Sequence, residues 1–84
     1  MLFKVYGKPD CPFCKKAVEI LQDNNIPYQY YSIGEHITKN ELIDTISLVN
    51  DNVEVKTVPE IVCGNKYIGG YTDLCDYLVE QDLV

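Results

Sequence analysis

The first third of the chain switches between strand-like and helical spacing of its apolar residues. A short apolar run over residues 2–6 is typical of a buried strand. From Pro12 onward, apolar residues recur at intervals of three and four, which predicts a helix that ends in the polar triplet at 23–25. Pro12 suits the first helical turn, because its missing N–H would be unpaired there anyway. A second strand, rich in half-buried tyrosines, is expected over residues 26–33.

The middle of the chain opens with a helix-start signal. Thr38 and Glu41 have the spacing of a capping box, in which each side chain binds the backbone N–H of the other residue. We therefore predict a second helix from this point. Its apolar side is expected to carry Leu42, Ile43, Ile46 and Val49.

The last third of the chain predicts a hairpin followed by a helix. Residues 60–63 and 66–69 are strand-like and flank a glycine–asparagine pair, which is typical of a two-residue turn. A final helix is expected to be capped by Thr72 or Asp73. Its apolar positions are Leu74, Tyr77 and Leu78.

This order of elements predicts an α/β fold. A helical crossover joins the first two strands, so they should be parallel, whereas the hairpin must be antiparallel. The simplest closure is a mixed four-stranded sheet with helices packed on its faces. A chain of 84 residues has room for one core, so we expect a single domain over residues 1–84.

Charge and composition limit the classes of partner that the protein can bind. The chain has 13 acidic residues against seven basic ones, all lysines, for a net charge of −6. Nucleic acid and anionic membrane both require clustered cations, so neither is expected. We find no apolar run near the ~20 residues of a membrane span and no leader pattern, and we expect a cytoplasmic protein.

Four cysteines carry most of the chemical information. A bond between Cys11 and Cys14 would close too short a loop to stabilise the fold much. A single Cys-x-x-Cys in a reducing compartment is typical of a redox dithiol. Cys63 and Cys75 lack the spacing of a second zinc-binding pair, so no metal is expected. Both are interpreted as packing residues. His36, the lone histidine, has no evident partner and is expected to be solvated.

The position of the dithiol suggests how it reacts. Cys11 falls at an exposed loop-to-helix junction, where free backbone N–H groups and the helix dipole stabilise a thiolate. The neighbouring cations Lys8, Lys15 and Lys16 favour the same form. Cys14, one turn further on and deeper, is expected to resolve the mixed disulfide that Cys11 forms with a substrate.

Three segments together resemble the dithiol glutaredoxins, particularly the small bacterial and bacteriophage members. They are Tyr-Gly-Lys-Pro-Asp-Cys-Pro-Phe-Cys at 6–14, Thr-Val-Pro at 57–59 and Gly-Gly-Tyr-Thr-Asp-Leu at 69–74. The resemblance implies a thioredoxin-like fold with sheet order 2-1-3-4 and three flanking helices. It also implies a monomeric, glutathione-dependent thiol–disulfide oxidoreductase that acts on protein disulfides and glutathione mixed disulfides, with ribonucleotide reductase as a family-level partner.

The resemblance further implies a glutathione site and a cis bond between Val58 and Pro59. The amides of residues 71–73 would bind the glutathione α-carboxylate, Asp73 its ammonium group, and Lys8 with Lys56 its glycyl carboxylate. The implied binding residues are Lys8, Phe13, Thr57, Val58, Pro59, Gly70, Tyr71, Thr72 and Asp73.

Some positions depart from the family pattern. Phe13 replaces a more usual tyrosine, Gly7 a small hydroxyl residue, Lys56 a frequent arginine and Thr72 a frequent acidic residue. These changes bear on affinity and partner choice. Two alternatives stay open: a redoxin of the same fold reduced by thioredoxin reductase, which the Gly-Gly-x-x-Asp-Leu segment disfavours, and an iron–sulfur cluster carrier, which Pro12 and the second cysteine disfavour.

Overall fold

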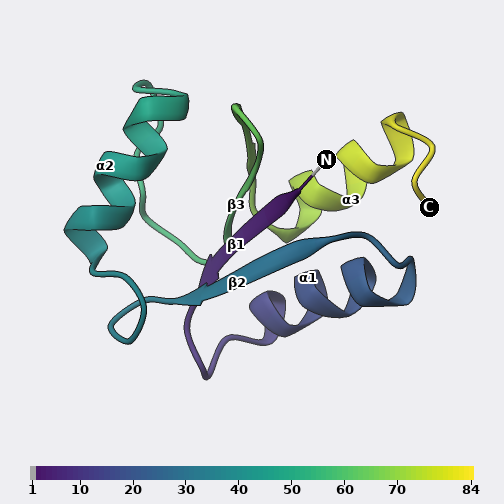
Figure 1. Cartoon of the computed structure of the whole chain (residues 1–84), viewed down its shortest axis with the longest axis horizontal. Coiled ribbons are helices and arrows are strands. Elements are labelled where there is room, and N and C mark those ends of the chain that lie inside the picture. Colours follow the sequence, from purple (N-terminus) through teal and green to yellow (C-terminus); the bar gives the residue numbers. More distant parts are fainter. Residues whose placement is uncertain (1) are drawn as a thin grey trace.

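A computed structural model describes residues 2–84 of the chain and shows three helices around a central sheet (Figure 1). Within these residues, none of the helices has the length and apolar character needed to cross a membrane. The elements in chain order are β1 (Phe3–Gly7), α1 (Pro12–Asp23), β2 (Tyr28–Ser32), α2 (Lys39–Val49), β3 (Glu60–Cys63), β4 (Lys66–Gly69) and α3 (Tyr71–Glu80).

The sheet has the strand order β2-β1-β3-β4. β1 pairs with β2 in parallel, while the β1–β3 and β3–β4 pairs are antiparallel. The predicted fold class and sheet order are therefore confirmed. The predicted second strand was too long at both ends. Its first residue, Ile26, donates its backbone N–H to the carbonyl oxygen of Leu21 at 2.9 Å and so closes α1, and Ile33 forms only an isolated bridge with Ile37.

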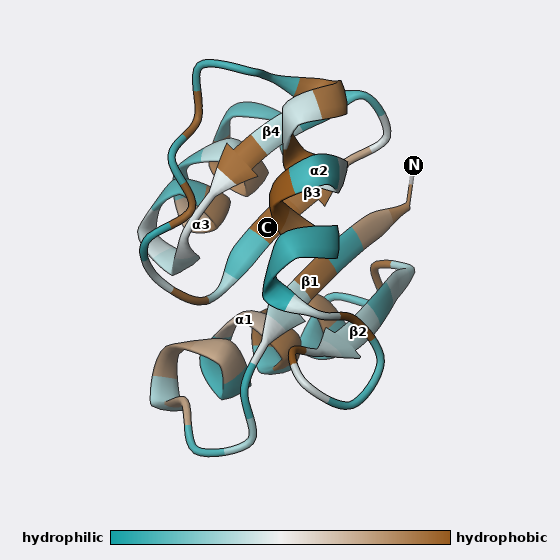
Figure 2. Ribbon diagram, turned by 90° about the vertical axis from the view of Figure 1, so that its left-hand side faces the viewer, coloured by the Kyte–Doolittle hydropathy of each residue, from teal (hydrophilic) through white to brown (hydrophobic). Residues whose placement is uncertain are grey.

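The helices divide between the two faces of the sheet. One core cluster joins β1 and β3 to α1 and α3, with Phe3, Val5 and Ile61 completely buried. The smaller cluster lies on the opposite face, where Leu42 and Ile46 of α2 cover Tyr6 and Val62. The ribbon coloured by hydropathy shows the apolar segments of β1 and β3 between these layers (Figure 2).

Side-chain caps fix where α2 and α3 begin. The predicted capping box of α2 is present: Glu41 N–H donates to Thr38 Oγ1 at 3.1 Å, and Thr38 N–H donates to Glu41 Oε1 at 2.9 Å. Ile43, expected on the apolar side, is exposed instead. The expected cap of α3 is also corrected. Gly70 is the N-cap residue, and Asp73, one turn inside the helix, accepts the Gly70 N–H at 3.0 Å.

Candidate active site

The Cys11–Cys14 pair lies at the start of α1 and forms a disulfide. Cys11 is the N-cap residue, and its sulfur accepts the backbone N–H of Cys14 at 3.1 Å. This is the position in which a free helix N–H and the helix dipole stabilise negative charge on sulfur. Cys11 is therefore the sulfur best placed to react as a thiolate.

The two cysteines differ in depth. Cys11 is 8% exposed and Cys14 is 1% exposed, so the expectation that Cys14 lies deeper is confirmed. The loop-to-helix junction is exposed as expected, at residues 8–10, 12 and 13, but the Cys11 side chain within it is largely covered. A substrate disulfide or an incoming thiolate can therefore reach the sulfur of Cys11 more readily than that of Cys14. This difference agrees with the assigned order of attack and resolution.

The cis peptide bond expected between Val58 and Pro59 is present. It precedes β3, and it brings the Val58 carbonyl oxygen to 3.8 Å from the sulfur of Cys11. A backbone acceptor thus lies directly beside the reactive sulfur. An extended peptide whose cysteine is bonded to Cys11 could pair with this segment like an added strand.

A groove of about 330 Å³ opens beside Cys11. It contains every residue expected to bind glutathione except Lys8 and Lys56. The lining residues are Phe13, Thr57, Val58, Pro59, Gly70, Tyr71, Thr72 and Asp73. Lys8 lies on the other side of the Thr57–Val58 segment, in a second pocket that it shares with Lys56.

The floor of the groove is the N-terminus of α3. Tyr71, Thr72 and Asp73 are its first three helical residues, whose N–H groups have no partner within the helix. This end of α3 requires a glycine at position 69. Gly69 has a positive φ of 119°, and a Cβ there would lie 2.5 Å from Asp73 Oδ2.

Two aromatic rings form one wall of the groove. Phe13 and Tyr71 stack with their centroids 6.1 Å apart, and Phe13 is 55% exposed. The Nζ of Lys16 lies 5.4 Å from the centroid of the Phe13 ring. A cation held on this ring adds positive charge to the side of the groove nearest the dithiol.

Glu60 is a feature of the site that the sequence interpretation missed. It follows Pro59 in β3, is 3% exposed, and its Oε2 accepts the Tyr67 hydroxyl at 2.7 Å. Burial raises the pKa of Glu60, and the negative charge of Asp73 adds to this effect, while the hydrogen bond from Tyr67 opposes it. The only sequence signal is its place in a strand whose other residues are apolar.

Gly7 leaves room for the dithiol and for a tyrosine. A Cβ at position 7 would lie 2.7 Å from Cys14 Sγ and 2.8 Å from the Tyr30 hydroxyl oxygen. That hydroxyl donates to the Lys8 carbonyl oxygen at 3.3 Å. A phenol oxygen from β2 therefore lies directly against Gly7.

The remaining candidate residues lie outside the groove. Cys63 is buried in the larger core cluster, and burial raises the pKa of its thiol, so it resists ionisation. Cys75 is half-buried on α3. The expectation that His36 lacks a partner is wrong, because its Nδ1 accepts the Ser32 N–H at 2.9 Å. Residues 2–84 contain no cluster of side chains suited to a metal ion.

Comparison with known proteins agrees with this geometry. The family model for glutaredoxin matches residues 3–68. A probable glutaredoxin of Acanthamoeba polyphaga mimivirus is 34% identical over 94% of this chain and 79% of its own length. Glutaredoxin 1 of Escherichia coli is 32% identical, with 92% of each chain covered.

Solved structures give the same result. The reduced glutaredoxin of Escherichia coli superposes with a TM-score of 0.72 at 32% identity over all of both chains. A complex of buckwheat glutaredoxin with glutathione has a TM-score of 0.74 at 18% identity, over 96% of this chain and 71% of that one, and supports the fold alone. With its Cys11–Cys14 redox pair, the chain belongs to the glutaredoxin family of thiol–disulfide oxidoreductases.

Proposed function

We propose that this glutaredoxin draws its electrons from glutathione and reduces glutathione mixed disulfides and protein disulfides. The observation that carries the proposal is the groove beside Cys11 with the lysines just beyond it, which together offer a distinct partner for each charged group of the tripeptide. The three free N–H groups of α3 suit a carboxylate, and the Asp73 carboxylate suits an ammonium group.

The opposite end of the groove supports the same orientation. Lys8 lies beyond Thr57 and Val58, where it can meet the glycyl carboxylate of a bound tripeptide. Lys56 lines the same pocket, but its ammonium group pairs with Glu54 at 3.5 Å. The cysteine of glutathione would then lie between the two ends, beside Cys11 and the Val58 carbonyl oxygen. A protein with a net charge of −6 thus presents cations locally to an anionic ligand.

The reaction with a glutathione mixed disulfide needs only Cys11. Its thiolate attacks the glutathionyl sulfur, the Cys11–glutathione bond forms, and the substrate leaves as a thiolate that takes up a proton. A second glutathione thiolate then attacks that bond. Oxidised glutathione is released, and Cys11 becomes a thiolate again.

A protein disulfide needs both cysteines. Cys11 attacks one substrate sulfur and frees the other as a thiol. The Cys14 thiolate then attacks the Cys11 sulfur, which releases the reduced substrate and leaves the Cys11–Cys14 disulfide present in the structure. Two glutathione molecules restore the dithiol. Ribonucleotide reductase is a substrate of this kind. We propose that it is a partner of this protein and that the reaction takes place in the cytoplasm.

A comparison of reductants tests the proposal. The purified protein is assayed on a small mixed disulfide with glutathione, glutathione reductase and NADPH, and in parallel with thioredoxin reductase and NADPH alone. We expect turnover with the glutathione system only. Efficient reduction by thioredoxin reductase, together with no turnover in the glutathione system, would contradict the proposal and favour a redoxin of the same fold.

A further inference from the structure

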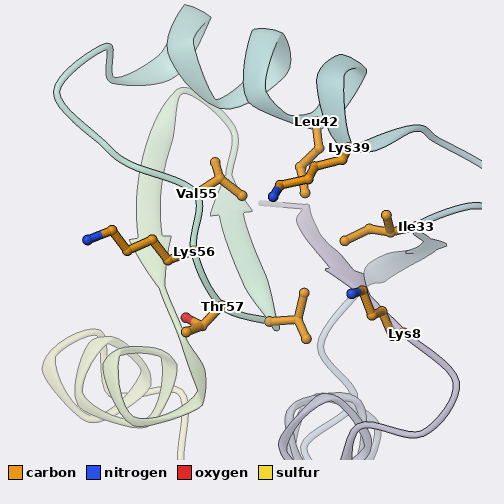
Figure 3. Close-up of a pocket in the computed structure, with 8 residues that line it drawn as sticks. Lys8, Ile33, Lys39, Leu42, Val55, Lys56 and Thr57 are labelled. Carbon is orange, nitrogen blue, oxygen red and sulfur yellow. The ribbon is translucent and has the colours of Figure 1, made fainter.

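A second pocket lies next to the groove and differs from it in character. It has a volume of about 210 Å³ and shares only Thr57 and Val58 with the groove. Its apolar surface comes from Ile33 in the loop after β2, Leu42 of α2 and Val55 in the loop before β3. Figure 3 shows these side chains facing a common space between α2 and the strands.

Three of the seven lysines line this pocket, and none of its lining residues within 2–84 is acidic. Lys56 points away from the centre (Figure 3) and pairs with Glu54 at 3.5 Å. Lys8 and Lys39 extend toward the central space from opposite sides. The pocket therefore combines an apolar surface with two ammonium groups, which suits an anionic ligand that also carries an apolar group.

Glutathione is too short to use this pocket fully. In the orientation of the proposed function, its chain runs from Asp73 past Cys11 to Lys8 and ends there, one residue after its cysteine. A protein substrate bound in the same direction continues by roughly 3.3–3.6 Å for each further residue. Its second and third residues after the cysteine would therefore reach the pocket beyond Lys8.

We propose that the pocket formed by Lys8, Ile33, Lys39, Leu42 and Val55 binds the segment that follows the reactive cysteine of a protein substrate, and that it selects an aliphatic side chain flanked by carboxylates. This inference rests on the proposed function for the direction of the bound chain. Lys39 and Lys8 supply the charge that recognises the carboxylates, and Ile33, Leu42 and Val55 receive the aliphatic group. The pocket volume corresponds to about seven water molecules, enough for one such side chain.

A single-turnover reaction tests the pocket without free glutathione. The Cys14→Ser protein is mixed with peptides whose cysteine carries a 2-nitro-5-thiobenzoate group, and Cys11 attacks the peptide sulfur and releases the coloured thiolate. The probes are Cys-Gly-Glu-Leu-Glu, its serine and lysine analogues Cys-Gly-Glu-Ser-Glu and Cys-Gly-Lys-Leu-Lys, and the reversed peptide Glu-Leu-Glu-Gly-Cys. We expect the first peptide to react roughly tenfold faster than each of the others at subsaturating concentration.

Lys39→Glu is the decisive variant, because Lys39 lies outside the groove. An acidic residue at the first position of α2 is compatible with the helix dipole, so the fold should be retained, and a thermal melt checks this. The matched control is Lys66→Glu, which makes the same charge change on β4, away from the pocket. We expect Lys39→Glu to abolish the preference for Cys-Gly-Glu-Leu-Glu and to leave the reaction with the glutathione–thiobenzoate disulfide within twofold. The control should change neither.

Three results would overturn the inference. Equal slowing by Lys39→Glu and Lys66→Glu would mean that only net charge matters. Equal slowing of the peptide and glutathione disulfides by Lys39→Glu would make the pocket part of the tripeptide site. A faster reaction of the reversed peptide would contradict the assigned direction. None of these outcomes depends on which reductase serves the protein, so failure of the proposed function remains distinguishable.

Discussion

At the scale of single residues, the dithiol assigns different tasks to two sulfurs one helical turn apart. Cys11 receives the N–H of Cys14 and borders the substrate groove, whereas Cys14 is covered by the fold. The thiol of Cys63 is buried away from the groove, and Cys75 lacks the N-cap position that stabilises a thiolate. The roles of Cys11 and Cys14 can therefore be separated by mutation.

Cys11→Ser should abolish all thiol transfer. A serine hydroxyl does not attack a disulfide under these conditions, and no other sulfur in the described residues 2–84 shares the helix-end environment of Cys11. Turnover of mixed and protein disulfides measures the loss, with the Cys63→Ala/Cys75→Ala double variant as a control that should stay near wild type. More than trace activity of Cys11→Ser would contradict the assignment of the nucleophile.

Cys14→Ser should affect the reduction of protein disulfides much more than the reduction of glutathione mixed disulfides. Reduction of glutathione mixed disulfides should persist, because free glutathione can resolve the bond to Cys11. Reduction of protein disulfides should fall by at least tenfold, because the resolving thiolate is lost. The two assays are run on the same preparation. An equal loss in both would show that Cys14 does more than resolve the intermediate.

Gly7→Ala should destabilise the oxidised protein by about 1–3 kcal/mol, the usual cost of overpacking a core. The reason is steric, since the added Cβ would overlap both Cys14 Sγ and the Tyr30 hydroxyl oxygen. Denaturant unfolding measures the change. In a Tyr30→Phe background the same substitution should cost less, because one of the two overlaps is gone. An identical cost in both backgrounds would assign the whole effect to the sulfur.

At the scale of elements, local signals were strong enough to place most helix starts and turns. Pro12, the Thr38–Glu41 box and the glycine–asparagine turn act within a few residues of chain, so the starts of α1 and α2 and the turn of the hairpin could be predicted from sequence. The start of α3 could not, because Asp73 serves as a cap from inside the helix. Its acceptor role depends on the close approach of Gly69 and Gly70.

Asp73→Asn tests the ligand-binding end of α3. Asparagine can still accept the Gly70 N–H, but it cannot offer a charge to the glutathione ammonium. A charge-assisted hydrogen bond contributes about 1.5–3 kcal/mol, so the KM for glutathione should rise roughly tenfold or more. Lys8→Ala should weaken binding from the other end of the tripeptide.

The stability of the same variant serves as its control. Loss of a charge in the first turn of a helix costs about 0.3–1 kcal/mol, so a thermal melt should shift by only a few degrees. A KM unchanged in the folded Asp73→Asn protein would contradict the role of this carboxylate. A large loss of stability would instead make Asp73 chiefly a cap.

At the scale of the whole molecule, tertiary packing creates features that sequence patterns did not predict. The family motifs identified the residues of the groove, because those residues lie in three short segments. The second pocket draws on α2 and on the loops that follow β1, follow β2 and precede β3, and only the folded chain brings them together. The same limit applies to Glu60, which is buried in β3 and bonded to the Tyr67 hydroxyl of β4 without any local signal in the sequence.

Glu60 should make the stability of the whole fold depend on pH. Burial raises its pKa above the value in the unfolded chain, so the folded state holds this proton more tightly. Stability from this group is fully present below the unfolded pKa of about 4.3, and it is lost as pH rises through the folded pKa. The hydrogen bond from Tyr67 limits the loss but does not cancel it.

Glu60→Gln should therefore stabilise the protein at pH 7 and have little effect near pH 3.5. Glutamine keeps an acceptor for the Tyr67 hydroxyl and removes the buried charge, together with its repulsion from Asp73. A gain of about 1 kcal/mol would raise the Tm by roughly 4–8 °C in a domain of this size. Thermal melts of both proteins across this pH range measure the difference. Tyr67→Phe should shift stability the other way at pH 7, because the carboxylate loses its donor. A Glu60→Gln protein less stable than wild type at pH 7, with the fold intact, would show that the charged form is the one the native structure favours.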